Sequence, residues 1–353
     1  MAEIKPFRAV RYDEVKAGPL ASLVAPPYDV IGPEERLDYL ERSPYNVVHL
    51  TLPESEEEAG RDFAAWREEG VLVDDEEALW ALEQDYVGPD GVGRTRRGLI
   101  VALKAEPYET GVVLPHERTH RGPKEGRLRL LRAVHAQLEP IFLLHEGSAP
   151  YDQPDGPPDL EVEGNRLWRI EDDGISDWFA ERTLLIADGH HRYETALAYA
   201  AEGGSPWMMV ALVSAEDPGL EIFPTHRLAQ HLNGAELPPP SGDPRDLLAF
   251  LEDEPRSRAV AVAYRPEGAG FLYGEEGELD VELVARHAPE ATYTASTDEA
   301  ISAVDEGKAE AAFLLRPLRV EDVFAKASRG EVMPQKSTYF FPKLLSGLLF
   351  LPA

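Results

Sequence analysis

The stretch from residue 184 to residue 204 restricts the possible folds more than any other part of the sequence. Residues 184–187 form an apolar run of strand length, and the pair that ends it, Asp188-Gly189, is typical of tight turns. Further apolar residues then recur on one helical face until a glycine pair ends the pattern: Tyr193, Ala196, Leu197 and Ala200, followed by Gly203-Gly204. The sequence therefore predicts a strand, a tight turn and a helix in direct succession.

The start of the predicted helix concentrates hydrogen-bond donors. Backbone N–H groups of a first helical turn have no intrahelical partner, and the helix dipole favours an anion there. An aspartate at this point also serves as an ordinary helix cap, but the run that follows it has no packing rationale. We therefore predict a phosphate-binding site at Asp188, Gly189, His190, His191 and Arg192.

The composition disfavours several classes of function. With 35 basic and 65 acidic side chains, the chain has a net charge of −30, which argues against nucleic-acid binding. The absence of cysteine rules out thiolate catalysis, disulfides and cysteine-ligated metals. There is neither an export signal nor a run of about 18 apolar residues, so we expect a cytoplasmic protein that does not enter membranes.

A basic island interrupts this acidic sequence. It comprises Arg118, Arg121, Lys124, Arg127, Arg129 and Arg132. Such a cluster suggests an anionic ligand, but a solvated helix face with counter-charges nearby explains most of these side chains as well.

Local patterns predict the elements that precede the phosphate site. Residues 78–87 and 97–105 have strand-like patterns, and turn residues at 88–91 join them into a β-hairpin. Residues 140–144 form a buried strand by the same criterion. A helix of about four turns begins near Pro123, because apolar positions recur at helical spacing through Leu128, Leu131, His135 and Leu138.

Two proline-rich stretches, residues 153–158 and 237–244, are predicted loops, and the second is a plausible domain boundary. We divide the chain into three parts: an N-terminal α/β segment with the hairpin (1–110), a phosphate-binding core (111–230) and a C-terminal α/β segment (231–353).

Two other motifs are weaker. Residues 116–120 match the H-E-x-x-H zinc motif, but Pro115 and Gly122-Pro123 leave too short a helix for it. Residues 330–337 lack the glycine that a Walker phosphate loop needs beside its lysine. Lys336, Ser337 and Thr338 remain candidates for anion contacts, with an ordinary turn as the alternative.

Several of these motifs, in this order, resemble known proteins. Residues 113–117, a helix, residues 140–142 and residues 186–193 are similar to the core of the free serine kinases, which belong to the ParB/sulfiredoxin-like superfamily. The whole chain also resembles a large bacterial family known as domain of unknown function 1015. That likeness rests on residues 5–7, 25–30, 115–117, 188–192, 224–227 and 333–338.

The resemblance implies an α+β fold: a ParB/sulfiredoxin-like kinase core, with a mixed sheet and helices, between the two α/β segments. It implies Glu117 as catalytic base, and Asp188 and His191 in catalysis. The phosphoryl donor would be ADP, ATP or pyrophosphate, held by residues 189–192 with Lys336 and Ser337, and Mg²⁺ would bind Asp188. The acceptor would be free serine or a similar hydroxyl metabolite, contacted by His116, Arg118, Thr119, His226 and Arg227.

Other functions stay open at this point. A ParB-like protein can bind a nucleotide as a switch without catalysis, and the 116–120 segment permits a metal-dependent hydrolase. Tyr28 and Asp29 either complete the site or form an extended turn after two prolines. The added segments leave the acceptor and donor undecided, and the sequence does not predict the oligomeric state.

Overall fold

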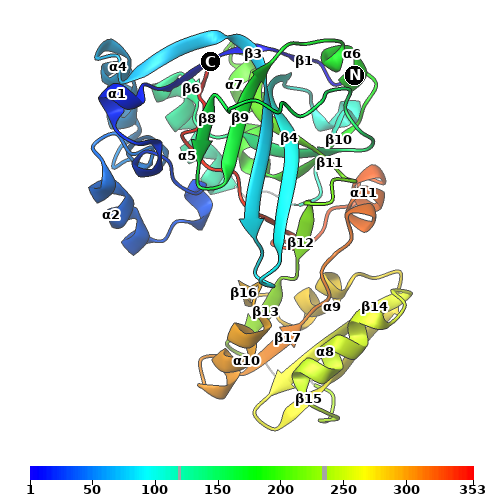
Figure 1. The fold of residues 1–353 in the computed structure, drawn as a ribbon. Coiled ribbons are helices and arrows are strands. Elements are labelled where there is room, and N and C mark those ends of the chain that lie inside the picture. Colours follow the sequence, from blue (N-terminus) through cyan, green and yellow to red (C-terminus); the bar gives the residue numbers. More distant parts are fainter. Residues whose placement is uncertain (118–120, 233–236) are drawn as a thin grey trace.

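The computed structural model describes residues 1–117, 121–232 and 237–353, and it is a mixed α/β structure with two lobes (Figure 1). The larger lobe contains a ten-stranded mixed sheet in the order β5-β10-β7-β11-β4-β3-β9-β8, in which β1 pairs with β4 and β2 with β3. The strands are β1 (Ile4–Lys5), β2 (Phe7–Tyr12), β3 (Leu72–Val87), β4 (Gly93–Lys104), β5 (Val113–Leu114), β7 (Ile141–His145), β8 (Leu160–Val162), β9 (Asn165–Ile170), β10 (Leu184–Asp188) and β11 (Trp207–Ser214).

The central strands of this sheet are buried on both faces. In β7 every residue is buried, and alternate side chains enter different cores: Phe142 and Leu144 one, Ile141 and Leu143 the other. The helical elements of this lobe are α1 (Glu14–Ala17), η1 (Leu20–Ser22), η2 (Tyr28–Val30), α2 (Pro33–Arg42), α3 (Val48–Thr51), α4 (Glu56–Glu68), η3 (Tyr108–Thr110), α5 (Arg121–Val134), α6 (Ile175–Phe179) and α7 (His190–Ala201).

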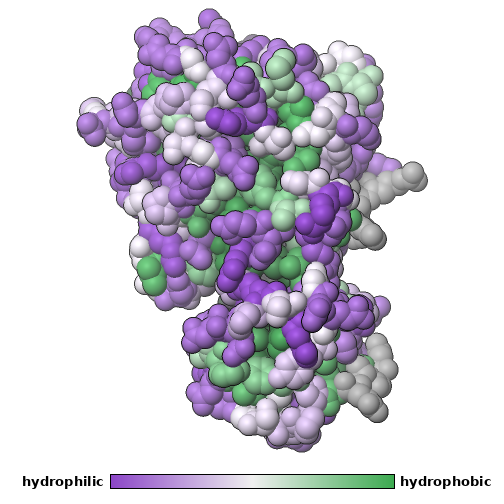
Figure 2. Space-filling model, turned by 90° about the vertical axis from the view of Figure 1, so that its right-hand side faces the viewer, coloured by the Kyte–Doolittle hydropathy of each residue, from purple (hydrophilic) through white to green (hydrophobic). Residues whose placement is uncertain are grey.

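The smaller lobe is an antiparallel five-stranded sheet with helices, below the large sheet in Figure 1. Its order is β15 (Gly268–Glu276), β14 (Arg258–Arg265), β17 (Ala311–Leu314), β13 (His226–Ala229) and β16 (Thr292–Thr294). The helices that follow β13 are α8 (Pro244–Asp253), α9 (Asp280–His287), α10 (Thr297–Asp305) and α11 (Val320–Ser328). Figure 2 shows a notch between the two lobes and polar residues over most of the visible face.

The end of the chain returns from the small lobe to the large one. β18 (Tyr339–Phe341) pairs with β12 (Glu221–Phe223), and β19 (Leu351–Pro352) pairs with β6 (Ala136–Gln137). Between them, the Ser346 amide donates to Ala25 O at 2.8 Å, and the Phe350 amide donates to Val10 O at 2.8 Å. The sheets therefore cross the expected segment limits, since β13 precedes residue 231 and the last strands rejoin the N-terminal part.

Several local predictions are confirmed. The hairpin forms as β3 and β4, the buried strand as β7, and the strand, turn and helix as β10, Gly189 and α7. One prediction is partly wrong. His135 has a positive φ of 53° and ends α5, so His135 and Leu138 lie beyond the helix and residues 136–137 form β6. Within the described residues, every helix is too short or too polar to span a bilayer.

Candidate functional site

A cavity of about 210 Å³ lies at the turn between β10 and α7. Three distant parts of the chain meet that turn: the η2 segment, Glu117 and the returning stretch 335–343. The cavity is lined by Tyr28, Asp29, Glu117, Ala187, Asp188, Gly189, His190, His191, Arg192, Gln335, Lys336, Thr338 and Lys343. The predicted helix-start residues are thus all at one cavity.

Asp188 lies between two cations. Its Oδ2 accepts a hydrogen bond from Arg192 Nη2 at 2.6 Å, and its Oδ1 forms an ion pair with Lys343 Nζ. Burial alone would raise the pKa of Asp188, but Lys343 and then Arg192 outweigh it and hold the pKa well below its usual range. Asp188 is therefore an anion that orients two cations at the cavity wall.

Local backbone geometry sets this arrangement. Gly189 has φ 94° and ψ 28°, a left-handed conformation that favours glycine, and a Cβ there would come within 3.1 Å of the Arg192 side chain. Arg192 also donates from Nη1 to the Pro140 carbonyl at 2.7 Å. Burial would lower the pKa of Arg192, but the negative charges of Glu139 and then Asp188 raise it, so the guanidinium keeps its charge.

His116 and His190 form a buried pair that ties the site together. Their ring centroids are 4.6 Å apart, and the His116 backbone amide donates to His190 Nε2 at 3.3 Å. His116 Nδ1 donates to the Ile186 carbonyl at 2.6 Å, because a carbonyl only accepts, and this leaves Nε2 to accept from Thr338 Oγ1 at 3.0 Å. Burial lowers the pKa of His116 to about 4 and that of His190 well below its usual value. Both rings are therefore neutral near pH 7.

These contacts bear on two predicted roles. Because both ring nitrogens of His116 have protein partners, His116 is poorly placed to ligate zinc or to contact a substrate. His190 lines the cavity, but its Nε2 serves as an acceptor within the protein and its ring carries no charge for a phosphate. His191 also lines the cavity.

Glu117 lies beside the phosphate-site residues, in a short backbone bridge with Met333. Burial raises the pKa of the Glu117 carboxyl, although the positive charge of Lys336 and a hydrogen bond from the Lys336 backbone amide offset part of that rise. The prediction that Glu117 precedes the Pro123-containing helix and does not belong to it is confirmed, since α5 begins at Arg121. A carboxylate with a raised pKa is suited to accept a proton near neutral pH.

The returning stretch 335–338 places its side chains differently from the prediction. Lys336 has φ 53°, and the turn that it makes sends Ser337 away from the cavity. Ser337 is buried, and its hydroxyl donates to the Pro334 carbonyl at 2.6 Å. Ser337 is therefore a structural residue, whereas Lys336 and Thr338, the other two candidates for anion contacts, line the cavity.

His226 and Arg227 do not line this cavity. His226 is buried in the small lobe, where Nδ1 accepts from the Leu315 amide at 3.0 Å and Nε2 contacts Thr297 Oγ1. Arg227 donates to the carbonyls of Thr225 and Lys336 at 2.6 and 2.9 Å, and lines a wider cleft of about 750 Å³. The ring nitrogens of His226 thus have partners away from the cavity, and Arg227 supports the turn at Lys336. That either residue contacts the substrate stays a prediction. Arg118 and Thr119 lie outside the described residues, as does His120 of the zinc motif.

Two contributions were missed or left open by sequence reasoning. Lys343 follows a Phe-Pro pair and had no local signal, because only the return of the chain brings it to Asp188. Tyr28 and Asp29 were an open choice and do line the cavity. The Tyr28 amide donates to the buried Glu139 carboxylate at 3.0 Å, and Arg127 from the basic island stacks on its ring at 3.7 Å.

Comparisons with known proteins place the chain in one family of sequences. The model of the family described as "Protein of unknown function (DUF1015)" matches residues 4–239. Comparison with curated proteins gives no match.

Several solved structures have a similar outline. A mutant free serine kinase in complex with AMP is 14% identical, with a TM-score of 0.45, and the match covers 68% of this chain and 87% of that one. A second mutant, in complex with ADP, is 14% identical with a TM-score of 0.44 over 68% and 87% of the two chains. A conserved hypothetical protein from Pyrococcus furiosus is 15% identical with a TM-score of 0.39, over 69% and 92%. At these values, the function has to be argued from the site itself.

Proposed function

This chain belongs to the DUF1015 family, and we propose that it is a small-molecule kinase that phosphorylates free serine or a similar hydroxyl metabolite. The donor is ADP, ATP or pyrophosphate, and the product with serine is O-phosphoserine. One observation carries the proposal: a carboxylate with a raised pKa, Glu117, shares a cavity of about 210 Å³ with the helix start and its cations. Phosphoryl transfer needs this pairing of a base with a phosphate cradle.

The donor phosphates lie against the start of α7. Arg192, Lys336 and Lys343 line the cavity and supply positive charge, and the first-turn amides of α7 add donors aimed at an anion. Asp188 holds Arg192 and Lys343 in place through its two carboxylate oxygens. These groups neutralise the charge that develops on the transferred phosphoryl group.

The acceptor hydroxyl approaches from the side of Glu117. The serine oxygen forms a bond to the terminal phosphorus of the donor while its proton passes to the Glu117 carboxylate. The bond from that phosphorus to the bridging oxygen breaks, and AMP, ADP or inorganic phosphate leaves according to the donor. Positioning and general-base catalysis are the contributions of the protein.

The carboxylate of Asp188 also suits Mg²⁺ as a ligand. A carboxylate offers about four lone-pair directions, and Arg192 and Lys343 use two of those of Asp188, so a hard cation can share this carboxylate with donor oxygens. When bound, Mg²⁺ would neutralise phosphate charge. Asp188 is the residue that would hold it.

The motif order further supports a ParB/sulfiredoxin-like core within residues 111–230, which we propose as the phosphate-binding part between the two α/β segments. The nucleotide-switch alternative uses the same cavity but predicts no product.

The test combines ADP, ATP and pyrophosphate with serine, threonine and homoserine in the presence of Mg²⁺, and identifies products by mass and by ³¹P NMR. We expect a phosphorylated acceptor that is absent with Glu117→Gln. Phosphate release without a phosphorylated acceptor would indicate a hydrolase. Donor binding with no turnover under any combination would indicate a switch.

A further inference from the structure

A second cavity, of about 310 Å³, lies at the opposite end of the central strands of the large sheet. It adjoins the carboxyl ends of the parallel strands β7 and β11, where His145 and Ser214 are register partners. Because β10 runs antiparallel to β7, Asp188 at the end of β10 lies near the start of β7, at the other end of these strands. Carboxyl ends of parallel strands are a common place for ligands in α/β sheets. The cavity is thus separate from the site of the proposed kinase reaction.

Gln153 contributes an unsatisfied amide to this cavity. Both its Nε2 and its Oε1 are buried, and neither has a hydrogen-bond partner among the residues that the structure describes. Buried polar side-chain atoms nearly always have partners, and an amide needs both an acceptor and a donor. A polar ligand that offers both would satisfy Gln153.

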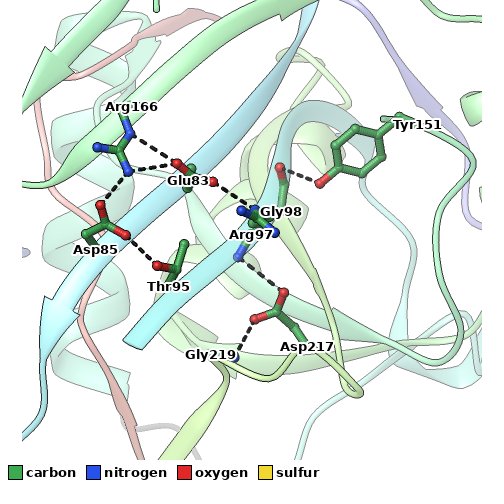
Figure 3. Close-up of polar contacts among 9 residues, drawn as sticks. All are labelled: Glu83, Asp85, Thr95, Arg97, Gly98, Tyr151, Arg166, Asp217 and Gly219. Carbon is green, nitrogen blue, oxygen red and sulfur yellow. Dashed lines mark hydrogen bonds and ion pairs between the residues drawn. The ribbon is translucent and has the colours of Figure 1, made fainter. Parts of the chain in front are cut away.

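Another part of the cavity wall is held by hydrogen bonds along and beside β4 (Figure 3). Arg97 Nε donates to Glu83 at 2.8 Å, and the Arg97 backbone amide donates to Asp217 Oδ2 at 3.3 Å. Asp217 also accepts from the Gly219 amide at 2.9 Å, and the Tyr151 hydroxyl donates to the Gly98 carbonyl at 3.1 Å. These contacts fix a carboxylate and a guanidinium side by side before any ligand arrives.

The charges of the lining select the class of ligand. Arg97 and three carboxylates, those of Asp152, Glu216 and Asp217, line the cavity, so it offers one site for a carboxylate and an excess of sites for an ammonium group. Burial raises the pKa of the Asp217 carboxyl, and a neighbouring ammonium group would offset that effect.

We infer that this cavity binds a free α-amino acid as a zwitterion. Its carboxylate group lies at Arg97, its ammonium group at Asp217, and a polar group of the ligand pairs with the Gln153 amide. The size of the cavity is at the lower end of small-molecule sites, as a single amino acid requires. The inference does not depend on the proposed kinase activity, because it concerns different residues at the other end of the central strands.

The test is a titration of the full chain with each of the common amino acids, followed by calorimetry and thermal unfolding. We expect at least one amino acid to bind with a Kd below about 1 mM. Asp217→Asn keeps the shape and an acceptor oxygen but removes the charge, and it should weaken binding about tenfold or more. Two analogues of the amino acid that binds should each bind at least tenfold more weakly than it does: the amine that lacks the carboxylate and the carboxylic acid that lacks the ammonium group. Equal binding of the amine would overturn the assignment of Arg97, and with it the zwitterion.

Gln153→Leu gives an independent readout. This change removes the unpaired amide, so the free protein should melt higher by roughly 1–3 °C while the shift induced by the amino acid disappears. Asp298→Asn removes an exposed carboxylate of the small lobe that pairs with Arg245, and it is the matched control: it should leave the amino-acid titration unchanged. The proposal fails if no amino acid binds with a Kd below about 1 mM, if Asp298→Asn weakens binding as much as Asp217→Asn does, or if Gln153→Leu melts lower than the wild type.

Discussion

Lys343 forms an ion pair with Asp188 although 155 positions of sequence separate them. The buried Arg96 fixes the approach to Lys343, because it donates to the carbonyls of Phe341 and Pro342 at 3.3 and 2.7 Å. The ammonium group is therefore positioned by β4 on one side and by Asp188 on the other. A cation fixed in this way is suited to contact a phosphate without reorganising.

Replacing Lys343 by Met should weaken donor binding about tenfold to a hundredfold at low salt, since a charge-assisted phosphate contact is lost. Isothermal titration calorimetry with pyrophosphate and with ADP measures this change in affinity. Lys308→Met removes an exposed lysine that pairs with Glu306, and it is the matched control for the change in net charge. Equal affinities of the two variants would remove Lys343 from the donor site.

Glu117→Gln should lower turnover by about 10²–10⁴-fold and leave donor affinity nearly unchanged, because it removes a base and keeps the shape. Since burial raises the pKa of Glu117, activity of the wild type should rise with pH through a limb that lies above the range of an ordinary glutamate. Initial rates between pH 4 and 8 test this. If Glu117→Gln keeps the same acid limb of the pH–rate profile, that limb reports the titration of another group.

Asp188→Asn should destabilise the protein by on the order of 3 kcal/mol at neutral pH, because two cations lose their shared anion. The folded-state pKa of Asp188 is depressed, so its stabilisation is present above the unfolded value of about 3.9 and is lost as the pH falls below it. Urea unfolding at several pH values should therefore show the variant and the wild type converging in acid. The variant should also weaken any Mg²⁺-dependent part of donor binding, measured by titration with and without Mg²⁺.

His116→Asn should flatten the pH dependence of stability between pH 6.5 and 4. Burial holds the folded-state pKa of His116 at about 4 against an ordinary 6.5, so the unfolded chain takes up a proton first and stability is lost as the pH falls through this window. The change in unfolding free energy across the window should be about 1–3 kcal/mol smaller in the variant.

Arg96→Met should raise the KM for the donor more than it lowers kcat, because Arg96 contacts the backbone beside Lys343 and does not line the cavity. Arg96→Lys, which keeps one donor, should restore part of the affinity. An equal loss in both variants together with a lower melting temperature would indicate a purely structural role.

The parts of the site that the sequence predicts are those whose cause is local. Asp188, Gly189 and Arg192 come together because a strand, a left-handed glycine and a helix follow one another within a few residues. Lys336, Ser337 and Thr338 were all candidates for anion contacts. Which of them face the cavity depends on the positive φ of Lys336, which the local sequence does not predict, and only Lys336 and Thr338 of the three line it. His226 carries a site-like motif, but its ring completes hydrogen bonds inside the small lobe.

Lys343 had no local signal of any kind. Its role comes from the return of the chain between β18 and β19, and pairings of that range are set by packing of the whole lobe. Similarly, Leu138 continues the helical spacing of α5, yet the left-handed His135 diverts the chain into β6.

The return of residues 335–343 to the large lobe has a consequence for biosynthesis. A nascent chain that has folded its sheet through β11 already carries Asp188 and Arg192, but it has no Lys336, Thr338 or Lys343. His116 then has no hydroxyl for its Nε2, and Asp188 has only one of its two cations. Such a ribosome-bound chain has only part of the proposed phosphate site. Competence would appear late in translation, when the last segment crosses the sheet and closes the cavity.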